Sequence, residues 1–133
     1  MGFLIDTDVA IHWRDGSKDV RERLIGLGAL PTISVLTRVE LENGVYRDPA
    51  LMERRRRLLD NMLARLPILN FTNDTAAIYS AIIGGIGVSK RKIIDRMIAA
   101  TAIENGMTLV TMNRTDFATI PGLVLETWPT PPA

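Results

Sequence analysis

The chain of 133 residues contains no cysteine and only one histidine, His12. The lack of cysteine excludes disulfide scaffolds, thiolate nucleophiles and cysteine-ligated zinc or iron–sulfur sites. A single histidine also excludes metal sites built on a histidine pair. We expect His12 to pack inside the fold and not to act in catalysis. Chemistry in this protein is therefore left to carboxylates, hydroxyls, lysine and arginine.

An excess of one charge and a long apolar run are also missing. Sixteen Lys and Arg residues stand against fifteen Asp and Glu, which gives a net charge of +1. Any affinity for nucleic acid or anionic lipid must then come from a local patch. The longest uncharged run, residues 75–89, is too short to span a bilayer, which takes about 20 apolar residues. Since no leader or lipidation pattern opens the chain, we expect a cytoplasmic protein without membrane attachment.

Short apolar runs alternate with longer amphipathic segments along the chain. The pattern predicts strands at 3–5, 32–34, 68–70, 108–110 and 123–126, and helices at 18–27, 35–46, 50–65, 74–86 and 94–105. Such alternation is typical of an α/β fold, with a parallel sheet covered by helices on both faces. We expect a single domain over residues 1–128, followed by a proline-rich C-terminal tail over 129–133.

Acidic and hydroxyl side chains follow the predicted strands. Asp6 comes directly after the first strand, and Thr111, Asn113 and Asp116 follow the fourth. Ligands of open α/β sheets bind beyond the carboxyl ends of the strands, so we expect these side chains to lie close together. An acid directly after a buried strand loses hydration without evident structural gain, which favours a functional role for Asp6. The other polar residues expected at this edge are Thr7, Asp8, Ser34 and Thr37.

Two further acids lie on predicted helices. A rotation of 100° per residue turns Glu40 toward the interior with its apolar neighbours, whereas Glu42 faces Arg38 on the solvent side. Asp95 shares a stripe with small and apolar residues such as Ala99, which lets its helix approach the sheet closely. Four acids are therefore expected to converge: Asp6, Glu40, Asp95 and Asp116.

Each helix or loop acid also has a purely structural interpretation. Asp95 can cap its helix, Asp116 can shape a turn, and Glu40 can form an internal ion pair. The basic runs at 54–57 and 90–92 can likewise bind phosphates or form solvated helix faces. These alternatives remain open at the level of the sequence.

Convergent carboxylates repel one another, and a partly buried one takes up a proton unless a cation lies nearby. Oxygen ligands without histidine or cysteine suit Mg²⁺ or Mn²⁺. Such an ion activates water and holds a phosphoryl oxygen. The residues alone therefore predict metal-dependent phosphate chemistry and do not specify the substrate.

Four segments, in their order and spacing, resemble the PIN-domain family and most closely its VapC-type toxins of prokaryotic toxin–antitoxin pairs. They read FLIDTD at 3–8, ELENG at 40–44, DRMIAA at 95–100 and TMNRTDF at 111–117. The resemblance implies a three-layer α/β/α sandwich around a central, mostly parallel five-stranded sheet, and a homodimer. It also implies a Mg²⁺- or Mn²⁺-dependent endoribonuclease that cuts RNA and is neutralised by a cognate antitoxin protein covering the acidic site.

The resemblance further implies roles for individual residues. Asp6, Asp95 and Asp116 would hold one or two metal ions, and Glu40 would orient the attacking water or complete the metal shell. The expected products are a 5′-phosphate and a 3′-hydroxyl. Asp8 stands where the family more often has asparagine. The supporting polar residues are Thr7, Asp8, Thr111 and Asn113.

Two alternative functions are weighed against this interpretation. The run Asp6-Thr7-Asp8-Val9 also satisfies the first motif of haloacid-dehalogenase-type phosphatases, with Asp6 as covalent nucleophile and Asp8 as general acid. Those enzymes are usually longer, and their chemistry does not require Glu40 or Asp95. The other alternative is a non-catalytic PIN module that binds a partner, against which the intact set of acids argues.

Overall fold

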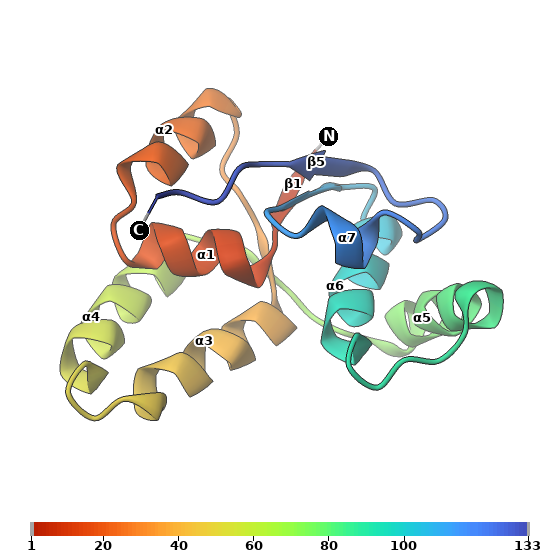
Figure 1. Cartoon of the computed structure of the whole chain (residues 1–133), viewed down its shortest axis with the longest axis horizontal. Coiled ribbons are helices and arrows are strands. Elements are labelled where there is room, and N and C mark those ends of the chain that lie inside the picture. The colour runs from red at the N-terminus through yellow and green to blue at the C-terminus, as the bar shows by residue number, and fades with distance from the viewer. Residues whose placement is uncertain (1, 133) are drawn as a thin grey trace.

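A computed structural model describes residues 2–132, which form five strands and seven helices (Figure 1). None of the helices in that range combines the length and apolar character needed to cross a bilayer. In chain order the elements are β1 (Phe3–Ile5), α1 (Thr7–Arg14), α2 (Lys18–Gly26), β2 (Ile33–Ser34), α3 (Val35–Arg47), α4 (Met52–Leu63), β3 (Ile68–Leu69), α5 (Asn73–Ile86), α6 (Ile93–Glu104), β4 (Thr108–Thr111), α7 (Arg114–Phe117) and β5 (Leu125–Thr127).

The strands are arranged in the order β3-β2-β1-β4-β5, and every pairing described is parallel. β1, β4 and β5 form one ladder, and β2 pairs with β3 in another. Thr32 joins the two ladders, because its N–H donates to the Phe3 carbonyl and its carbonyl accepts from the Ile5 N–H, both at 2.9 Å. The predicted parallel five-stranded sheet is therefore confirmed.

Successive strand residues point to opposite faces of the sheet and feed two separate cores. Ile5 and Val110 pack with residues of α1 to α4, whereas Leu4 and Leu109 pack with residues of α5 to α7. All four side chains are fully buried. Figure 1 shows α1 to α4 gathered on one side of the strands and α5 to α7 on the other. The predicted three-layer sandwich is thus confirmed.

Two helices were not predicted from the sequence. α1 has eight residues and begins immediately after β1, with Asp6 as its N-cap; α7 has four residues. Segments this short show too few turns for the helical repeat of apolar residues to emerge. α1 nevertheless matters for the site, because it carries Thr7 and Asp8 in its first turn. His12, also on α1, is partly buried.

The C-terminal segment returns to α1 after β5. Trp128 is buried in the core beside α1 to α4, and its indole N–H donates to Glu126 at 2.6 Å. Beyond it, Pro131 and Pro132 line a surface hollow together with His12 and Ser17. The outer limits of the predicted domain and tail, residues 1 and 133, lie outside the described residues.

Candidate active site at the carboxyl edge of the sheet

Asp6 is a buried carboxylate at the end of β1, with 3% of its surface exposed. Its Oδ1 accepts a hydrogen bond from the Thr7 N–H, and its Oδ2 accepts one from the Thr111 hydroxyl, both at 2.8 Å. The first bond caps helix α1. The expectation that Asp6 brings no structural gain is therefore wrong. Thr111 closes β4, the neighbour of β1, so the two strand ends meet at this carboxylate.

Glu40 extends from α3 toward Thr7. The Thr7 hydroxyl donates to Glu40 Oε1 at 2.5 Å and lies 3.1 Å from the hydroxyl of Thr37, which is fully buried. Within residues 2–132, no lysine, arginine or histidine nitrogen lies within 4.0 Å of the Glu40 carboxylate. The internal ion pair considered for Glu40 is thus not formed.

Glu42, by contrast, behaves as its place on the solvent side predicts. It pairs with Arg38 one turn earlier on α3 and with Arg56 of α4. Both pairs are partly exposed at the protein surface, and the pair with Arg56 connects α3 to α4. Two acids separated by one position on the same helix therefore have opposite environments, as the helical period requires.

Asp95 and Asp116 form the other half of the site. Asp95 lies in the first turn of α6, but Lys92 occupies the N-cap position and Asp95 makes no capping bond. Asp116 lies in α7, where the Asn113 amide donates to its Oδ2 at 2.5 Å. The Lys92 ammonium lies 3.6 Å from its Oδ1. A capping role for Asp95 is therefore not observed, and Asp116 makes contacts well beyond its own turn.

The electrostatics show that the acids share one environment. Burial raises the pKa of Asp6 to about 7, against the opposing effect of the bonds from Thr111 and Thr7. Burial also raises the pKa of Asp95 to about 6, and the adjacent Asp116 carboxylate adds to this rise. Smaller contributions come from Asp8 and Glu40. Because each acid disfavours the ionised form of another, a cation at this site would relieve the repulsion.

The residues fit a divalent ion by their donor chemistry. All four acids offer hard oxygen ligands, the kind that suits Mg²⁺ and Mn²⁺. In the part of the chain that the structure describes, no three of them are yet close enough to ligate one ion together. Asp6, Glu40 and Asp116 are instead each held by a hydroxyl, amide or ammonium group of the protein. Ion binding would exchange some of these partners for the metal.

The remaining candidates fall into two groups. Thr7, Thr111 and Asn113 contact site acids directly, and Asp8 is exposed in the first turn of α1 and adds negative charge to the site. Thr37 also belongs to this network, although the sequence predicted only its place at the sheet edge. The sequence feature that could have identified Thr37 is its position one helical turn before Glu40, which places its hydroxyl on the same face of α3.

The two basic runs differ in their contacts. In the run at 54–57, Arg55 donates to the Gly44 carbonyl at 2.8 Å and Arg56 pairs with Glu42, so both tie α4 to α3. Arg54 and Arg57 are exposed. In the run at 90–92, the first two residues are exposed and Lys92 contacts Asp116. Only the second run therefore reaches the acidic site.

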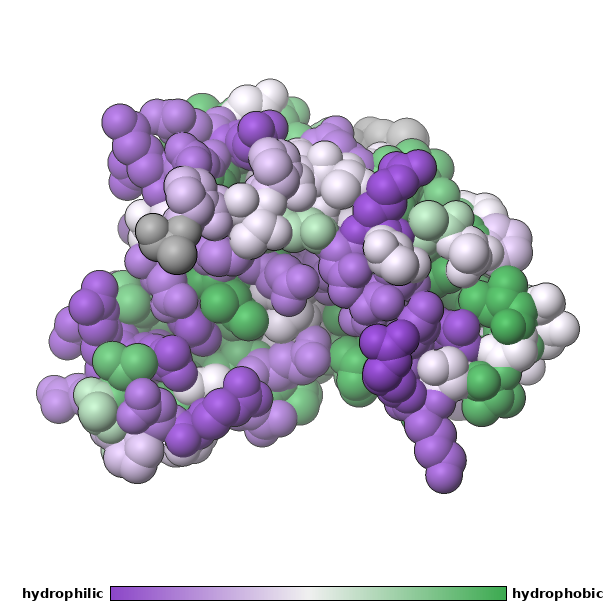
Figure 2. Space-filling view, viewed as in Figure 1, coloured by the Kyte–Doolittle hydropathy of each residue, from purple (hydrophilic) through white to green (hydrophobic). Residues whose placement is uncertain are grey.

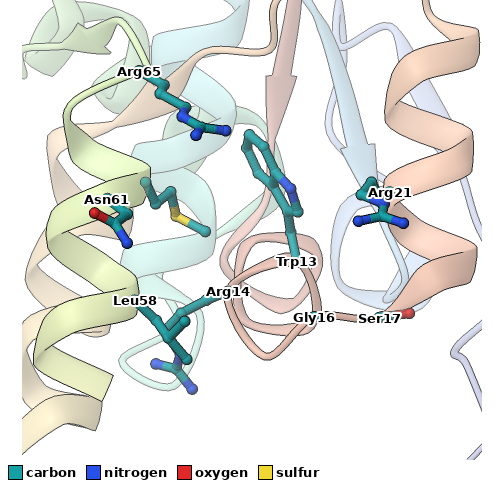
Figure 3. Close-up of a pocket in the computed structure, with 9 residues that line it drawn as sticks. Trp13, Arg14, Gly16, Ser17, Arg21, Leu58, Asn61 and Arg65 are labelled. Carbon is teal, nitrogen blue, oxygen red and sulfur yellow. The ribbon is translucent and has the colours of Figure 1, made fainter. Parts of the chain in front are cut away.

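A separate cavity of about 310 Å³ lies between α1, α2 and α4 (Figure 3). In Figure 3 the Trp13 ring lies between Arg65, just after α4, and Arg21 of α2. Arg14 also lines this cavity, and its buried guanidinium pairs with Asp15 at 3.0 Å. None of the four site acids is among its lining residues. The cavity is therefore distinct from the candidate active site.

Comparison with curated proteins identifies relatives along almost the entire chain. The tRNA(fMet)-specific endonuclease VapC of Salmonella typhimurium is 30% identical over 130 residues, which cover 95% of this chain and 97% of the relative. Ribonuclease VapC2 of Rickettsia felis is 30% identical over 134 residues, covering 96% and 98%.

Solved structures give the same result for the fold. VapBC2 from Rickettsia felis bound to a promoter DNA fragment has a chain that superposes with a TM-score of 0.86 at 28% identity, covering 96% of this chain and 99% of that one. DNA-bound VapBC from Salmonella typhimurium gives 0.83 at 28% identity, covering 96% and 98%. The PIN domain model matches residues 3–123, a range that includes all four site acids. The chain therefore belongs to the PIN-domain family, and within it to the VapC-type proteins.

Proposed function

We propose that this protein is a Mg²⁺- or Mn²⁺-dependent endoribonuclease and the toxin of a toxin–antitoxin pair. The observation that carries the proposal is the convergence of Asp6, Glu40, Asp95 and Asp116 from four different segments at the carboxyl edge of a parallel sheet. The burial and mutual repulsion of these acids raise the pKa of Asp6 and Asp95, which favours a cation partner. The nuclease names of the relatives support the same chemistry.

In this mechanism the chain's own residues position the reactants. Asp6, Asp95 and Asp116 would hold the metal, and Thr111 and Asn113 would keep the first and last of these in place. Bound Mg²⁺ or Mn²⁺ supplies a positive charge beside the phosphate and lowers the pKa of water.

Glu40 is the acid suited to orient the attacking water. Its Oε1 is fixed by the Thr7 hydroxyl, and it has no cationic partner among the described residues to neutralise it. In-line attack by that water on a phosphodiester would leave a 5′-phosphate and a 3′-hydroxyl.

The proposed partners are an RNA substrate and an antitoxin protein. The Salmonella relative is named a tRNA(fMet)-specific endonuclease, so initiator tRNA is the first substrate to test. The structural neighbours are VapBC complexes of toxin with antitoxin, which supports an antitoxin partner for this chain. An RNA target would place its action in the cytoplasm.

We also propose a homodimer. Val39 and Tyr46, seven residues apart on α3, lie on one face of that helix and are 51% and 61% exposed. A second copy of the chain could cover these apolar side chains. Light scattering of the purified protein, with Tyr46→Glu as the variant expected to dissociate the dimer, tests this assembly.

End-labelled RNA cleavage by purified protein, with Mn²⁺ and with EDTA, tests the proposed activity. Wild type is compared with Asp6→Asn and with the surface control Glu42→Gln, all purified by one scheme because contaminating ribonucleases imitate the result. Metal-dependent cleavage that is lost only in Asp6→Asn supports the proposal. Cleavage that survives in Asp6→Asn is contamination.

An Asp8→Asn variant, measured for both RNA cleavage and phosphatase activity, separates the two alternatives from the nuclease. The family match does not favour a haloacid-dehalogenase-type phosphatase, for which Asp8→Asn would abolish activity. For the nuclease, the same change would only weaken cleavage, because Asp8 is an exposed contributor of charge. A non-catalytic PIN module would bind its partner without cutting any RNA under either condition.

A further inference from the structure

Lys92 is a cationic side chain in contact with the candidate active site. Its Nζ lies 3.6 Å from Oδ1 of Asp116, and the two side chains are only 22% and 16% exposed. In residues 2–132, no other lysine, arginine or histidine nitrogen lies within 4.0 Å of a carboxylate of the four site acids. Lys92 is thus a counter-ion built into one edge of an otherwise acidic site.

The loop that carries Lys92 is anchored to the helix that carries Asp95. Arg96 of α6 is buried, and its guanidinium donates to the Gly87 carbonyl at 2.7 Å. Gly87 ends α5 with a positive φ of 90°, a conformation that favours glycine. The two ends of the loop at 87–92 are therefore both tied to α6. This anchoring holds Lys92 beside Asp116.

The same loop adds positive charge next to the acids. Lys90 and Arg91 precede Lys92 and are exposed, and Arg114 is exposed at the start of α7. Figure 2 shows hydrophilic side chains gathered over α6 and α7 and around the loop between α5 and α6. Phosphates of a nucleic acid strand are attracted to lysine and arginine, whereas the site acids alone would repel them. The loop therefore offers RNA a favourable approach to an acidic centre.

We propose that Lys92 competes with the metal ion for Asp116 and, once displaced, binds a phosphate of the RNA substrate. This inference rests on the proposed function and assigns a substrate-positioning role to a residue outside the acid set. An ammonium and a divalent cation repel each other on the same carboxylate, so metal binding frees Lys92. Its flexible four-carbon stem and three donors then suit a phosphate oxygen nearby.

A Mn²⁺ titration followed by the melting temperature tests the competition without any RNA. Wild type is compared with Lys92→Met, Lys92→Arg and the loop control Lys90→Met. We expect Lys92→Met to bind Mn²⁺ about three- to tenfold more tightly, because the competing ammonium is gone. Lys92→Arg should stay near wild type. An affinity in Lys92→Met equal to that in Lys90→Met would overturn the competition, since it would reflect only the loss of one nearby charge.

RNA cleavage at saturating Mn²⁺ tests the second half of the proposal. Lys92→Met should lower kcat/KM at least about tenfold. The slope of log(kcat/KM) against the logarithm of the salt concentration should become shallower by the amount expected for about one lost phosphate contact. Lys92→Arg should restore most of the activity. Cleavage by Lys92→Met at the wild-type rate would overturn the phosphate role. If the melting temperature of metal-free Lys92→Met lies well below that of wild type, Lys92→Gln is used in its place, because the amide can still bond to Asp116 without a charge.

The two proposals fail in different ways. If wild type cuts no RNA with either metal, the proposed function is wrong, and the Mn²⁺ titration still decides whether Lys92 competes for Asp116. If wild type cuts RNA and the Lys92 variants match their controls in both assays, only the role of Lys92 is wrong.

Discussion

The Thr111 hydroxyl donates a 2.8 Å hydrogen bond to Oδ2 of Asp6, a residue 105 positions earlier in the chain. The register of β1 and β4 pairs Ile5 with Val110, so the next residue of each strand lies directly at the carboxyl edge. The Thr111 hydroxyl also accepts from the Asn113 N–H at 3.0 Å. One side chain thus links the buried acid of β1 to the loop that carries Asp116.

Replacing Thr111 by valine should weaken Mn²⁺ binding by raising the pKa of Asp6. The substitution keeps the shape but removes a bond that lowers the pKa of Asp6, so that pKa should rise further. We expect Mn²⁺ affinity at pH 7 to fall and its pH dependence to move to higher pH. The loss of a buried bond should cost about 1–3 kcal/mol in unfolding free energy. Thr111→Ser, which keeps the hydroxyl, is the control, and equal Mn²⁺ affinity in both variants would contradict this role.

Metal-free stability should depend on pH through Asp6. Its pKa rises from 3.8 in the unfolded chain to about 7 in the fold, so the folded state binds more protons between these values. The free energy of unfolding therefore falls as pH rises from about 4 to about 7, and the full penalty is present above pH 7. Asp6→Asn should remove this penalty and stabilise the metal-free protein at pH 8 by about 1–3 kcal/mol.

Urea unfolding in EDTA at pH 5 and pH 8 measures the effect. The difference between Asp6→Asn and wild type should be larger at pH 8 than at pH 5. A variant less stable than wild type at pH 8 would show that the ionised carboxylate, through its bond to the Thr7 N–H, stabilises α1 more than burial destabilises the charge.

Divalent metal should raise the melting temperature, and more so at pH 8 than at pH 6. At pH 6, protons compete with the ion for Asp6 and Asp95, whose pKa values are about 7 and about 6. At 100 times Kd, binding is worth about 2.7 kcal/mol. Thermal unfolding with and without Mn²⁺ should show the shift in wild type and in the control Glu22→Gln, and little or none in Asp95→Asn. Glu22 is exposed on α2 and is not one of the site acids. A full shift in Asp95→Asn would exclude that residue as a ligand.

Glu40→Gln should lower the activity without destabilising the fold. The glutamine can still accept the bond from the Thr7 hydroxyl, so we expect the melting temperature to change little. The lost charge should lower kcat for RNA cleavage by about 10²-fold or more. Glu42→Gln is the matched control on the same helix, and it should keep full activity while losing at most about 1 kcal/mol from its surface ion pairs. Equal activities in the two variants would remove Glu40 from the mechanism.

The sequence predicted the main strands and longer helices because their apolar periods are clear. It failed at α1, where eight residues follow a strand without a break. That omission also hid the second role of Asp6, since a helix that is not predicted needs no cap. The first turn of α1 therefore holds Asp6 in place through the Thr7 N–H and also positions the Thr7 hydroxyl for its bond to Glu40.

The sequence by itself determined which acids face inward and that they form an all-oxygen set, because strand ends and helical periods are local properties. Only the tertiary structure decided their partners: Thr111 for Asp6, Thr7 for Glu40, and Asn113 with Lys92 for Asp116. It also showed that Arg55 and Arg56 serve the packing of α4 on α3, whereas Lys92 reaches the site. These outcomes depend on strand register and helix packing between distant segments, and no local pattern encodes distances of that kind.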